Sequence, residues 1–317
     1  MTVVQPDQPR TLGIDIGGTK THLAVGAGKE PRSERFVDTT SWRTHSYPDN
    51  ARGVHRLVEE WLGAEALAWP MAVGAHGCDT TAQCESFATE LRRYFTGGVR
   101  VVNDAELLTA AAGLPGGIGV IAGTGAIAVA RDGRGELLTA GGWGWVLGDE
   151  GSSAGLIREA TRAVLGELDL GASLDPLGRR LMAAFGVNEG PELALAVSTA
   201  GSAAWLGSHA EQVFLAADEG SALADRVVTR AGQQLALLVD RLAGRGADAG
   251  RIVAAGTVIL VQPRLRQAFL DAVRLHQPSS VLHFLDRPPV LGALALASRL
   301  VQDGTEVATP AGTGGAR

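Results

Sequence analysis

A carboxylate followed by a glycine-rich turn is the first feature of this 317-residue sequence that could do chemistry. Asp15 stands near the end of an apolar run, and Gly17-Gly18-Thr19-Lys20 follows it closely. Glycines let backbone N–H groups approach phosphate oxygens, a threonine adds a hydroxyl group, and a carboxylate can hold Mg²⁺ through water. The spacing to the lysine and to the next helix is not that of a P-loop. The segment predicts a site for a metal-chelated phosphate, with a plain glycine hairpin as the alternative.

Two further turns of similar composition follow later in the chain. Gly123-Thr124-Gly125 comes after an apolar run and is a second turn of the phosphate type. Gly256-Thr257 ends a predicted strand, and its small residues would let the chain pass beside an adenine. The sequence therefore offers two candidate phosphate turns and one candidate adenine turn.

The segment 141–153 is dense in glycine and also carries aromatic and acidic side chains. Trp143, Asp149 and Glu150 lie in it, just before a predicted helix. A plain connecting loop seldom needs so many special backbone positions together. We therefore regard this segment as a candidate binding loop.

Asp104 follows Asn103 at the junction between an apolar strand and a helix. A lone aspartate at such a junction is most often a helix N-cap, and that alternative stands beside a catalytic one. Opposite a phosphate turn, a carboxylate at this position would orient an attacking hydroxyl group.

Both cysteines of the chain, Cys78 and Cys84, lie in one short stretch with His76, Asp79 and Glu85. These residue types by themselves suggest a metal site or a redox pair. Neither cysteine belongs to a C-x-C or C-x-x-C unit, so we expect neither zinc nor an iron–sulfur cluster. We also expect no disulfide in a cytoplasmic protein. The two thiols are instead predicted to pack the loop as small apolar groups.

Strands and helices must position these candidates. Hydrophobic periodicity and glycine turns predict a β-hairpin followed by alternating strands and helices, twice along the chain. The first half has predicted strands at 11–16, 21–26, 33–38, 69–73 and 99–102, and helices at 50–62, 84–95 and from Asp104. The second has predicted strands at 118–122, 126–131, 135–140 and 251–255, a mostly helical stretch 151–245 and a last helix 289–302. Two such halves indicate a duplicated α/β architecture, with a disordered tail after Asp303.

Composition limits the class of protein. The chain is 45% hydrophobic and 20% charged, and its formal net charge of −6 gives no basic excess that would favour nucleic acid. No apolar run approaches the roughly 20 residues of a membrane span, and the N-terminus lacks a signal-peptide pattern. We expect a cytoplasmic enzyme of two domains. Its oligomeric state stays open, a homodimer included.

Taken together, the motifs carry a family resemblance. GIDIGGTKT, VVNDAELLTAAAG, GVIAGTGAIAVA, GGWGWVLGDEGSSAGLIREA and AAGTVI resemble the N-acetylglucosamine kinase branch of the BadF/BadG/BcrA/BcrD-type ATPase family, within the actin, hexokinase and heat-shock ATPase superfamily. The match runs from about residue 11 to about residue 300. It implies two ribonuclease-H-like (actin/hexokinase-type) α/β domains around a central ATP/sugar cleft. Residues 1–112 plus 288–317 would form the first, completed by the last helix, and residues 113–287 the second, ATP-binding domain.

The resemblance also implies roles for the candidate residues, with ATP and Mg²⁺ as cofactors. Asp104 is similar to the family's catalytic base, which takes the proton from a sugar 6-hydroxyl, and Asp15 to the carboxylate that organises Mg²⁺. The positions that match or adjoin substrate-binding ones are Asp79, Asn103, Gly123, Trp143, Asp149 and Glu150. The positions similar to ATP-binding ones are Gly17, Gly18, Thr19, Lys20, Thr124, Gly256 and Thr257.

The stretch 75–85 faces the position where the resemblance implies a pocket for the sugar's C2 substituent. Asp79 and Glu85 would place carboxylates there, and a carboxylate favours an ammonium over a neutral acetamide. The Cys-Asp-Thr-x-x-Gln-Cys pattern also resembles that of the actinobacterial glucosamine kinases. We expect an ATP-dependent glucosamine kinase that forms glucosamine 6-phosphate, with an N-acetylglucosamine kinase as the alternative.

Two other classes of function are weaker alternatives. An ATPase that activates a redox partner would hold an iron–sulfur cluster on cysteines, and the surroundings of Cys78 and Cys84 do not resemble that motif. A sugar sensor would usually carry an added DNA-binding domain, whereas only about ten residues precede the first predicted strand.

Overall fold

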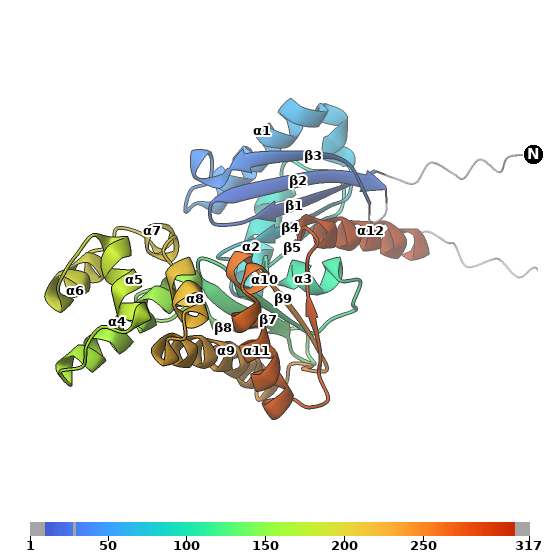
Figure 1. The fold of residues 1–317 in the computed structure, drawn as a ribbon. Coiled ribbons are helices and arrows are strands. Elements are labelled where there is room, and N and C mark those ends of the chain that lie inside the picture. Colours follow the sequence, from blue (N-terminus) through green and yellow to red (C-terminus); the bar gives the residue numbers. More distant parts are fainter. Residues whose placement is uncertain (1–9, 28–29, 308–317) are drawn as a thin grey trace, which may run out of the picture. The chain divides into compact units, whose positions relative to one another are not determined.

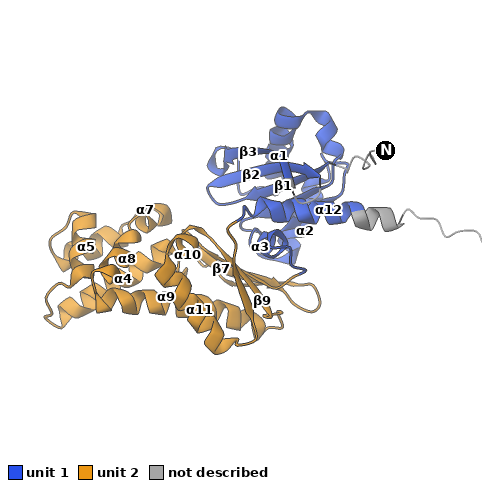
Figure 2. Ribbon diagram, turned by 45° about the vertical axis from the view of Figure 1, so that its right-hand side comes forward, with its two compact units in different colours: residues 1–115, 287–317 blue, residues 116–286 orange. Residues whose placement is uncertain are grey.

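The computed structural model describes residues 10–27 and 30–307. The chain divides into two compact units, Met1–Pro115 with Arg287–Arg317 and Gly116–Asp286 (Figure 2). The sequence placed these boundaries at 112/113 and 287/288, within a few residues of those in the structure. Each unit is built on a mixed sheet of five strands.

The sheet of the first unit has the strand order β3-β2-β1-β4-β5. It consists of β1 (Thr11–Ile16), β2 (Lys20–Ala27), β3 (Glu30–Asp38), β4 (Met71–Ala75) and β5 (Val99–Val102). The first three strands pair antiparallel, whereas β4 and β5 run parallel to β1. Because the three parallel strands end at the same edge of the sheet, the turns that follow them are neighbours.

Four α-helices belong to the first unit: α1 (Tyr47–Leu62), α2 (Thr81–Leu91), α3 (Glu106–Ala111) and α12 (Val290–Val307) (Figure 1). The last of them comes from the far end of the chain. Its Ala293, Leu296 and Ala297 share a buried cluster with Ala72 of β4 and Leu107 of α3. The prediction of a disordered tail after Asp303 is wrong as far as Val307, because α12 continues to that residue. The rest of the predicted tail lies outside the described residues.

The second unit repeats this sheet, with the order β10-β9-β6-β7-β8. Its strands are β6 (Ile118–Ala122), β7 (Ala126–Arg131), β8 (Leu137–Gly141), β9 (Arg251–Ala255) and β10 (Val281–Phe284). Again three strands pair antiparallel, and two follow parallel to the first of them. The predicted duplicated α/β architecture is confirmed. The sequence analysis did not predict β10, whose four residues are all at least partly exposed.

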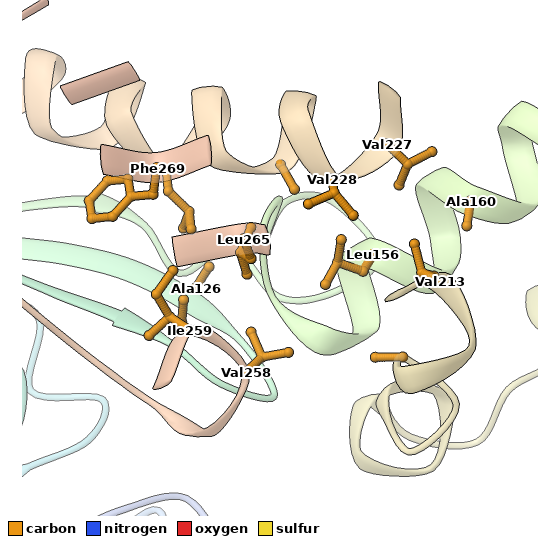
Figure 3. Packing of buried hydrophobic residues seen from close by; sticks show 14 of the residues in the cluster. Ala126, Leu156, Ala160, Val213, Val227, Val228, Val258, Ile259, Leu265 and Phe269 are labelled. Atoms are coloured by element: carbon orange, nitrogen blue, oxygen red, sulfur yellow. The ribbon is translucent and has the colours of Figure 1, made fainter. Parts of the chain in front are cut away.

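Helices form the rest of the second unit. They are α4 (Ser153–Asp169), α5 (Pro176–Phe185), α6 (Gly190–Ser198), α7 (Ala203–Gly207), α8 (Glu211–Asp218), α9 (Ala222–Ala243), α10 (Thr257–Val261) and α11 (Pro263–His276). Leu156 of α4, Val228 of α9 and Leu265 of α11 belong to one buried hydrophobic cluster (Figure 3). Within the described part of the chain, no helix is both long enough and apolar enough to span a membrane.

Candidate active site

Two carboxylates interact at the edge of the first sheet where β1, β4 and β5 end. Asp15 lies at the penultimate position of β1, and Asp104 lies two residues beyond β5. Burial, with the negative charge of Asp104 as the second cause, raises the pKa of Asp15 to about 7. A divalent cation nearby would favour the ionised carboxylate against both effects, so Asp15 fits the role of holding Mg²⁺. Among residues 10–27 and 30–307, no three His, Cys, Asp or Glu gather as a metal site. The remaining ligands of Mg²⁺ would therefore be phosphate and water oxygens.

The turn between β1 and β2 closes with a hydrogen bond from the Gly17 N–H to the Lys20 carbonyl oxygen, at 3.0 Å. Gly18 and Thr19 are exposed at its tip. The Lys20 ammonium lies 3.8 Å from the ring centroid of Phe36, on β3. The structure therefore leaves the turn itself accessible to an anion, and it places the Lys20 side chain against an aromatic ring.

A capping box shapes the loop after β4. Thr80 Oγ1 accepts the N–H of Gln83 at 3.2 Å, and Gln83 Oε1 accepts the N–H of Asp79 at 2.8 Å. This reciprocal arrangement starts α2 at Thr81, three residues before its predicted start. Asp79 is an exposed residue of this loop, although its carboxyl group is partly buried. This partial burial raises the pKa of Asp79, and the charge of nearby His76 acts in the opposite direction.

Asn103 is fully buried and ties this loop to the start of α3. Its Nδ2 donates to the Cys78 carbonyl oxygen at 3.2 Å and to Asp79 Oδ1 at 3.0 Å, and its Oδ1 accepts the N–H of Ala105 at 2.9 Å. Both polar ends of the amide therefore have partners within the protein. In this structure Asn103 holds Asp79 in place.

Asp104 is not a helix N-cap, which makes that alternative wrong. Helix α3 begins at Glu106, and its N-cap is Ala105. Asp104 Oδ1 accepts the Ala105 N–H at 3.0 Å, and Oδ2 lies 3.6 Å from Nδ1 of His76. The carboxylate side chain is 13% exposed, so it is largely shielded and still accessible. These properties suit a general base.

The two cysteine thiols are buried, and Cys84 Sγ donates to the Cys78 carbonyl oxygen at 3.6 Å. The prediction that they pack the loop is confirmed. Glu85, by contrast, is exposed on α2 and pairs with Arg92 at 2.5 Å. Of the two carboxylates predicted beside the sugar's C2 substituent, only Asp79 contacts another candidate residue.

Two turns of the second unit lie side by side, because they follow the parallel neighbours β6 and β9. Gly256 has a φ of 114°, and a Cβ at this position would lie 2.4 Å from the Ala122 carbonyl oxygen. Only glycine fits there. A Cβ on Gly123 would lie 3.6 Å from Thr257 Oγ1. The structure thus brings the predicted phosphate turn at Gly123-Thr124 next to the predicted adenine turn.

Asp149 is held under strain in the glycine-rich loop before α4. Its φ is 59°, and no other non-glycine residue in the described part of the chain has a positive φ. Its Oδ1 is buried without a hydrogen-bond partner, and a Cβ on Gly125 would lie 2.9 Å from its Oδ2. Burial raises the pKa of Asp149, against the N–H groups of Ala126 and Gly144. A strained residue with an unsatisfied acceptor is suited to accept a hydrogen bond from a ligand.

Arg158 of α4 holds the backbone of the same loop. Its Nη1 donates to the carbonyl oxygens of Trp145 and Gly148, the latter at 2.6 Å, and its Nη2 lies 3.6 Å from Glu150. Glu150 also lines a cavity of about 750 Å³ between α4 and α9. Trp143 is 72% exposed. The loop therefore combines an exposed aromatic ring with a backbone that Arg158 holds in place.

Sequence reasoning did not assign His76 or Arg158. His76 could have been found, because it directly follows β4 and so lies at the same sheet edge as Asp15 and Asp104. No sequence signal pointed to Arg158, which is one of two arginines in an amphipathic helix.

Comparisons with known proteins agree with this fold. The model of the BadF/BadG/BcrA/BcrD ATPase family matches residues 12–276. The N-acetylmuramic acid/N-acetylglucosamine kinase of Clostridium acetobutylicum is 31% identical over 166 residues, which cover 50% of this chain and 54% of that protein. The chain thus spans about half the length of this curated relative.

Solved structures share the fold at lower identity. A proposed N-acetylglucosamine kinase from Chromobacterium violaceum has a TM-score of 0.65 and 24% identity, covering 92% of this chain and 100% of that one. A ROK family glucokinase from Streptomyces griseus, in complex with glucose and AMPPNP, has a TM-score of 0.57 and 17% identity, covering 92% and 99%. The two five-stranded sheets match these two-domain, actin/hexokinase-like structures. With the family model covering most of its length, the chain belongs to the BadF/BadG/BcrA/BcrD ATPase family.

Proposed function

We propose that the protein is an ATP-dependent sugar kinase that phosphorylates the 6-hydroxyl of an N-acetylated amino sugar. One observation carries this proposal: Asp104, freed from a capping role, stands at the same sheet edge as Asp15 and the exposed Gly18-Thr19 turn. A base, a carboxylate suited to Mg²⁺ and a phosphate turn are the parts that phosphoryl transfer to a hydroxyl group requires. Membership in an ATPase family and the name of the curated relative support the same activity.

In this mechanism the oxygen of the sugar hydroxyl attacks the terminal phosphorus of ATP, and Asp104 Oδ2 accepts the hydroxyl proton. The bond between that phosphorus and the bridging oxygen breaks, and ADP leaves with the bridging oxygen. The turn at Gly18-Thr19 and the turn at Gly123-Thr124 would donate N–H and hydroxyl groups to phosphate oxygens. Asp15 would hold Mg²⁺ through water, and bound Mg²⁺ neutralises phosphate charge. Positioning and charge neutralisation supply most of the catalysis in such reactions.

The identity of the sugar is the finer part of the proposal. The activity for which the relative from Clostridium acetobutylicum is named supports N-acetylglucosamine over the glucosamine expected from the sequence. Glucosamine stays a second candidate because of Asp79, an exposed residue whose carboxylate lies beside Asn103. Glu85, the other carboxylate of that expectation, is paired with Arg92 and so gives glucosamine less support than Asp79 does.

A substrate panel tests both levels of the proposal. Purified protein with ATP and Mg²⁺ is assayed on N-acetylglucosamine, N-acetylmuramic acid, glucosamine, glucose and mannosamine. We expect the highest kcat/KM with an N-acetylated sugar, and a preference for glucosamine would select the second candidate. If no sugar on the panel stimulates ATP consumption, the kinase proposal is wrong.

A further inference from the structure

One histidine faces the proposed base directly. His76 is the first residue after β4, and its Nδ1 lies 3.6 Å from Asp104 Oδ2. The other carboxylate oxygen, Oδ1, accepts the N–H of Ala105. The imidazole therefore lies beside Oδ2, the carboxylate oxygen proposed to accept the proton of the sugar hydroxyl. The His76 side chain is 59% exposed, against 13% for Asp104.

The backbone of His76 is anchored from two sides. Its N–H donates to the Ile16 carbonyl oxygen at 2.8 Å, and its own carbonyl oxygen accepts from the guanidinium of Arg43. The far edge of the ring lies toward the phosphate turn, because a Cβ on Gly18 would lie 3.8 Å from Cδ2 and 3.9 Å from Nε2. The imidazole thus occupies the space between the base and the turn that would hold phosphate.

The charges around the ring favour a protonated Nδ1. Asp104 is the first cause that raises the pKa of His76, burial opposes it, and the charges of Arg43 and Asp79 act in opposite directions. An imidazole that keeps its Nδ1 proton points an N–H group at the carboxylate. At 3.6 Å the contact has the length of an ion pair, and a small approach of the two groups would make it a hydrogen bond. Such a contact would restrict the rotation of the carboxylate, as the third member of a catalytic group orients the base in other enzymes.

We propose that His76 is a positioning residue for Asp104, holding Oδ2 at the angle that receives the sugar hydroxyl beside the phosphate turn. This inference rests on the proposed kinase function. It predicts that losing the donor lowers kcat, because a base that rotates freely is less often in the productive geometry. The binding of sugar and ATP should change little, since His76 acts through Asp104.

The test compares His76→Ala, His76→Asn and a control, His55→Asn. Asparagine keeps an N–H donor near the position of Nδ1, whereas alanine removes it. His55 lies on α1 of the same unit, 3.8 Å from Glu59, and so loses a comparable contact with a carboxylate. We expect His76→Ala to lower kcat by roughly 30-fold or more with both KM values within about threefold. His76→Asn should recover most of that loss, and His55→Asn should match the wild type. An unchanged kcat in His76→Ala, or a loss confined to KM, would overturn the proposal, as would equal losses in both His76 variants.

A second measurement does not depend on activity. The Cε1–H resonance of His76, identified by its absence in His76→Asn, is titrated by NMR in the wild type and in Asp104→Asn. We expect the pKa of His76 to fall when the neighbouring carboxylate is neutralised. An unchanged titration would overturn the contact on which the proposal stands. If the wild type phosphorylates no sugar, the proposed function fails by itself, and the titration still decides whether His76 engages Asp104.

Discussion

The two units share a strand order but differ in what their sheet edges carry. Both sheets place an antiparallel hairpin beside two parallel strands. Titratable groups line the edge in the first unit, where the charges of His76, Asp79 and Asp104 act on one another. Small turns line the edge in the second, where Gly123 and Gly256 let two chain segments lie side by side.

This difference indicates a division of work on a duplicated scaffold. The first edge is suited to moving a proton and holding a cation, because it gathers carboxylates and the pKa values of Asp15 and Asp79 are raised there. The second edge is suited to contacting phosphate and sugar through backbone groups, which need close approach more than charge. Asp149 is the exception, a strained carboxyl group among glycines. Substitutions in each unit can break or sharpen this comparison.

The largest effect is expected at Asp104. The Asp104→Asn protein keeps the shape of the side chain but cannot accept the sugar proton, so kcat should fall by about 10³-fold or more. Binding of ATP, followed by calorimetry, should persist. The matched control is Asp132→Asn, in an exposed turn of the second unit, and it should leave kcat unchanged. A kcat for Asp104→Asn near that of the wild type would mean that Asp104 is not the general base.

A purely steric change should produce the next largest effect. Gly256→Ala would force a Cβ to within 2.4 Å of the Ala122 carbonyl oxygen at a φ of 114°. We expect a loss of unfolding free energy of roughly 2–4 kcal/mol and weaker ATP binding, because the two turns would be pushed apart. Chemical denaturation and calorimetry measure the two effects.

Gly166→Ala is the matched control in the same unit. No heavy atom would lie within 4 Å of a Cβ at this position in α4, so alanine should be neutral or stabilise the helix by up to about 1 kcal/mol. Equal behaviour of the two variants would show that close approach at Gly256 is unimportant.

The sequence predicted the fold well where short-range patterns determine it. Alternating apolar residues and glycine turns located β1, β6, β7 and β9 with the bounds that the structure has. Capping shifted other elements. Ser46 begins α1 at Tyr47, three residues before its predicted start, because its side chain accepts the Asp49 N–H. The strand β10 was missed because its half-exposed residues lack a clear buried face.

Long-range contacts of the candidate site were harder to predict. Asp15 and Asp104 interact across β4, which lies between β1 and β5, and no local pattern predicts that interaction. Trp42 is buried in the first unit, and its Nε1 donates to Thr21 Oγ1 at 3.2 Å, a contact between residues 21 positions apart. The ion pair of Glu85 with Arg92 joins residues seven positions apart, so no local pattern showed this pairing when Glu85 was predicted beside the sugar's C2 substituent.

A smaller effect is expected at Asp149 in the second unit. Asn tolerates a positive φ and removes the charge from a partly buried position, so Asp149→Asn should fold with at least the stability of the wild type. It also replaces one carboxylate oxygen by an NH₂ group, which cannot accept a hydrogen bond from the sugar. We expect the KM for the sugar to rise about tenfold, with the KM for ATP within about twofold. A lower stability and an unchanged KM would make Asp149 a structural residue of the loop.

The last prediction concerns stability rather than activity, through a change with pH at Asp15. Its pKa is about 7 in the folded protein and 3.8 ordinarily, so the folded state binds the proton more tightly than the unfolded state does. The stability that protonation provides is complete below about pH 4 and is lost as the pH rises through 7. The difference of about three units between the two pKa values corresponds to at most about 4 kcal/mol of unfolding free energy.

Asp15→Asn should therefore melt a few degrees higher than the wild type at pH 8 and should lose that advantage at pH 4, in thermal scans without nucleotide. The control is again Asp132→Asn, whose pKa is lowered, chiefly by the Arg134 N–H. Its contribution has the opposite sign, present above the ordinary pKa and lost in acid, so this variant should gain nothing at pH 8. A constant difference between Asp15→Asn and the wild type across this range would mean that Asp15 is not held at a raised pKa. The first edge would then lack the charge repulsion between Asp15 and Asp104 that a divalent cation would reduce.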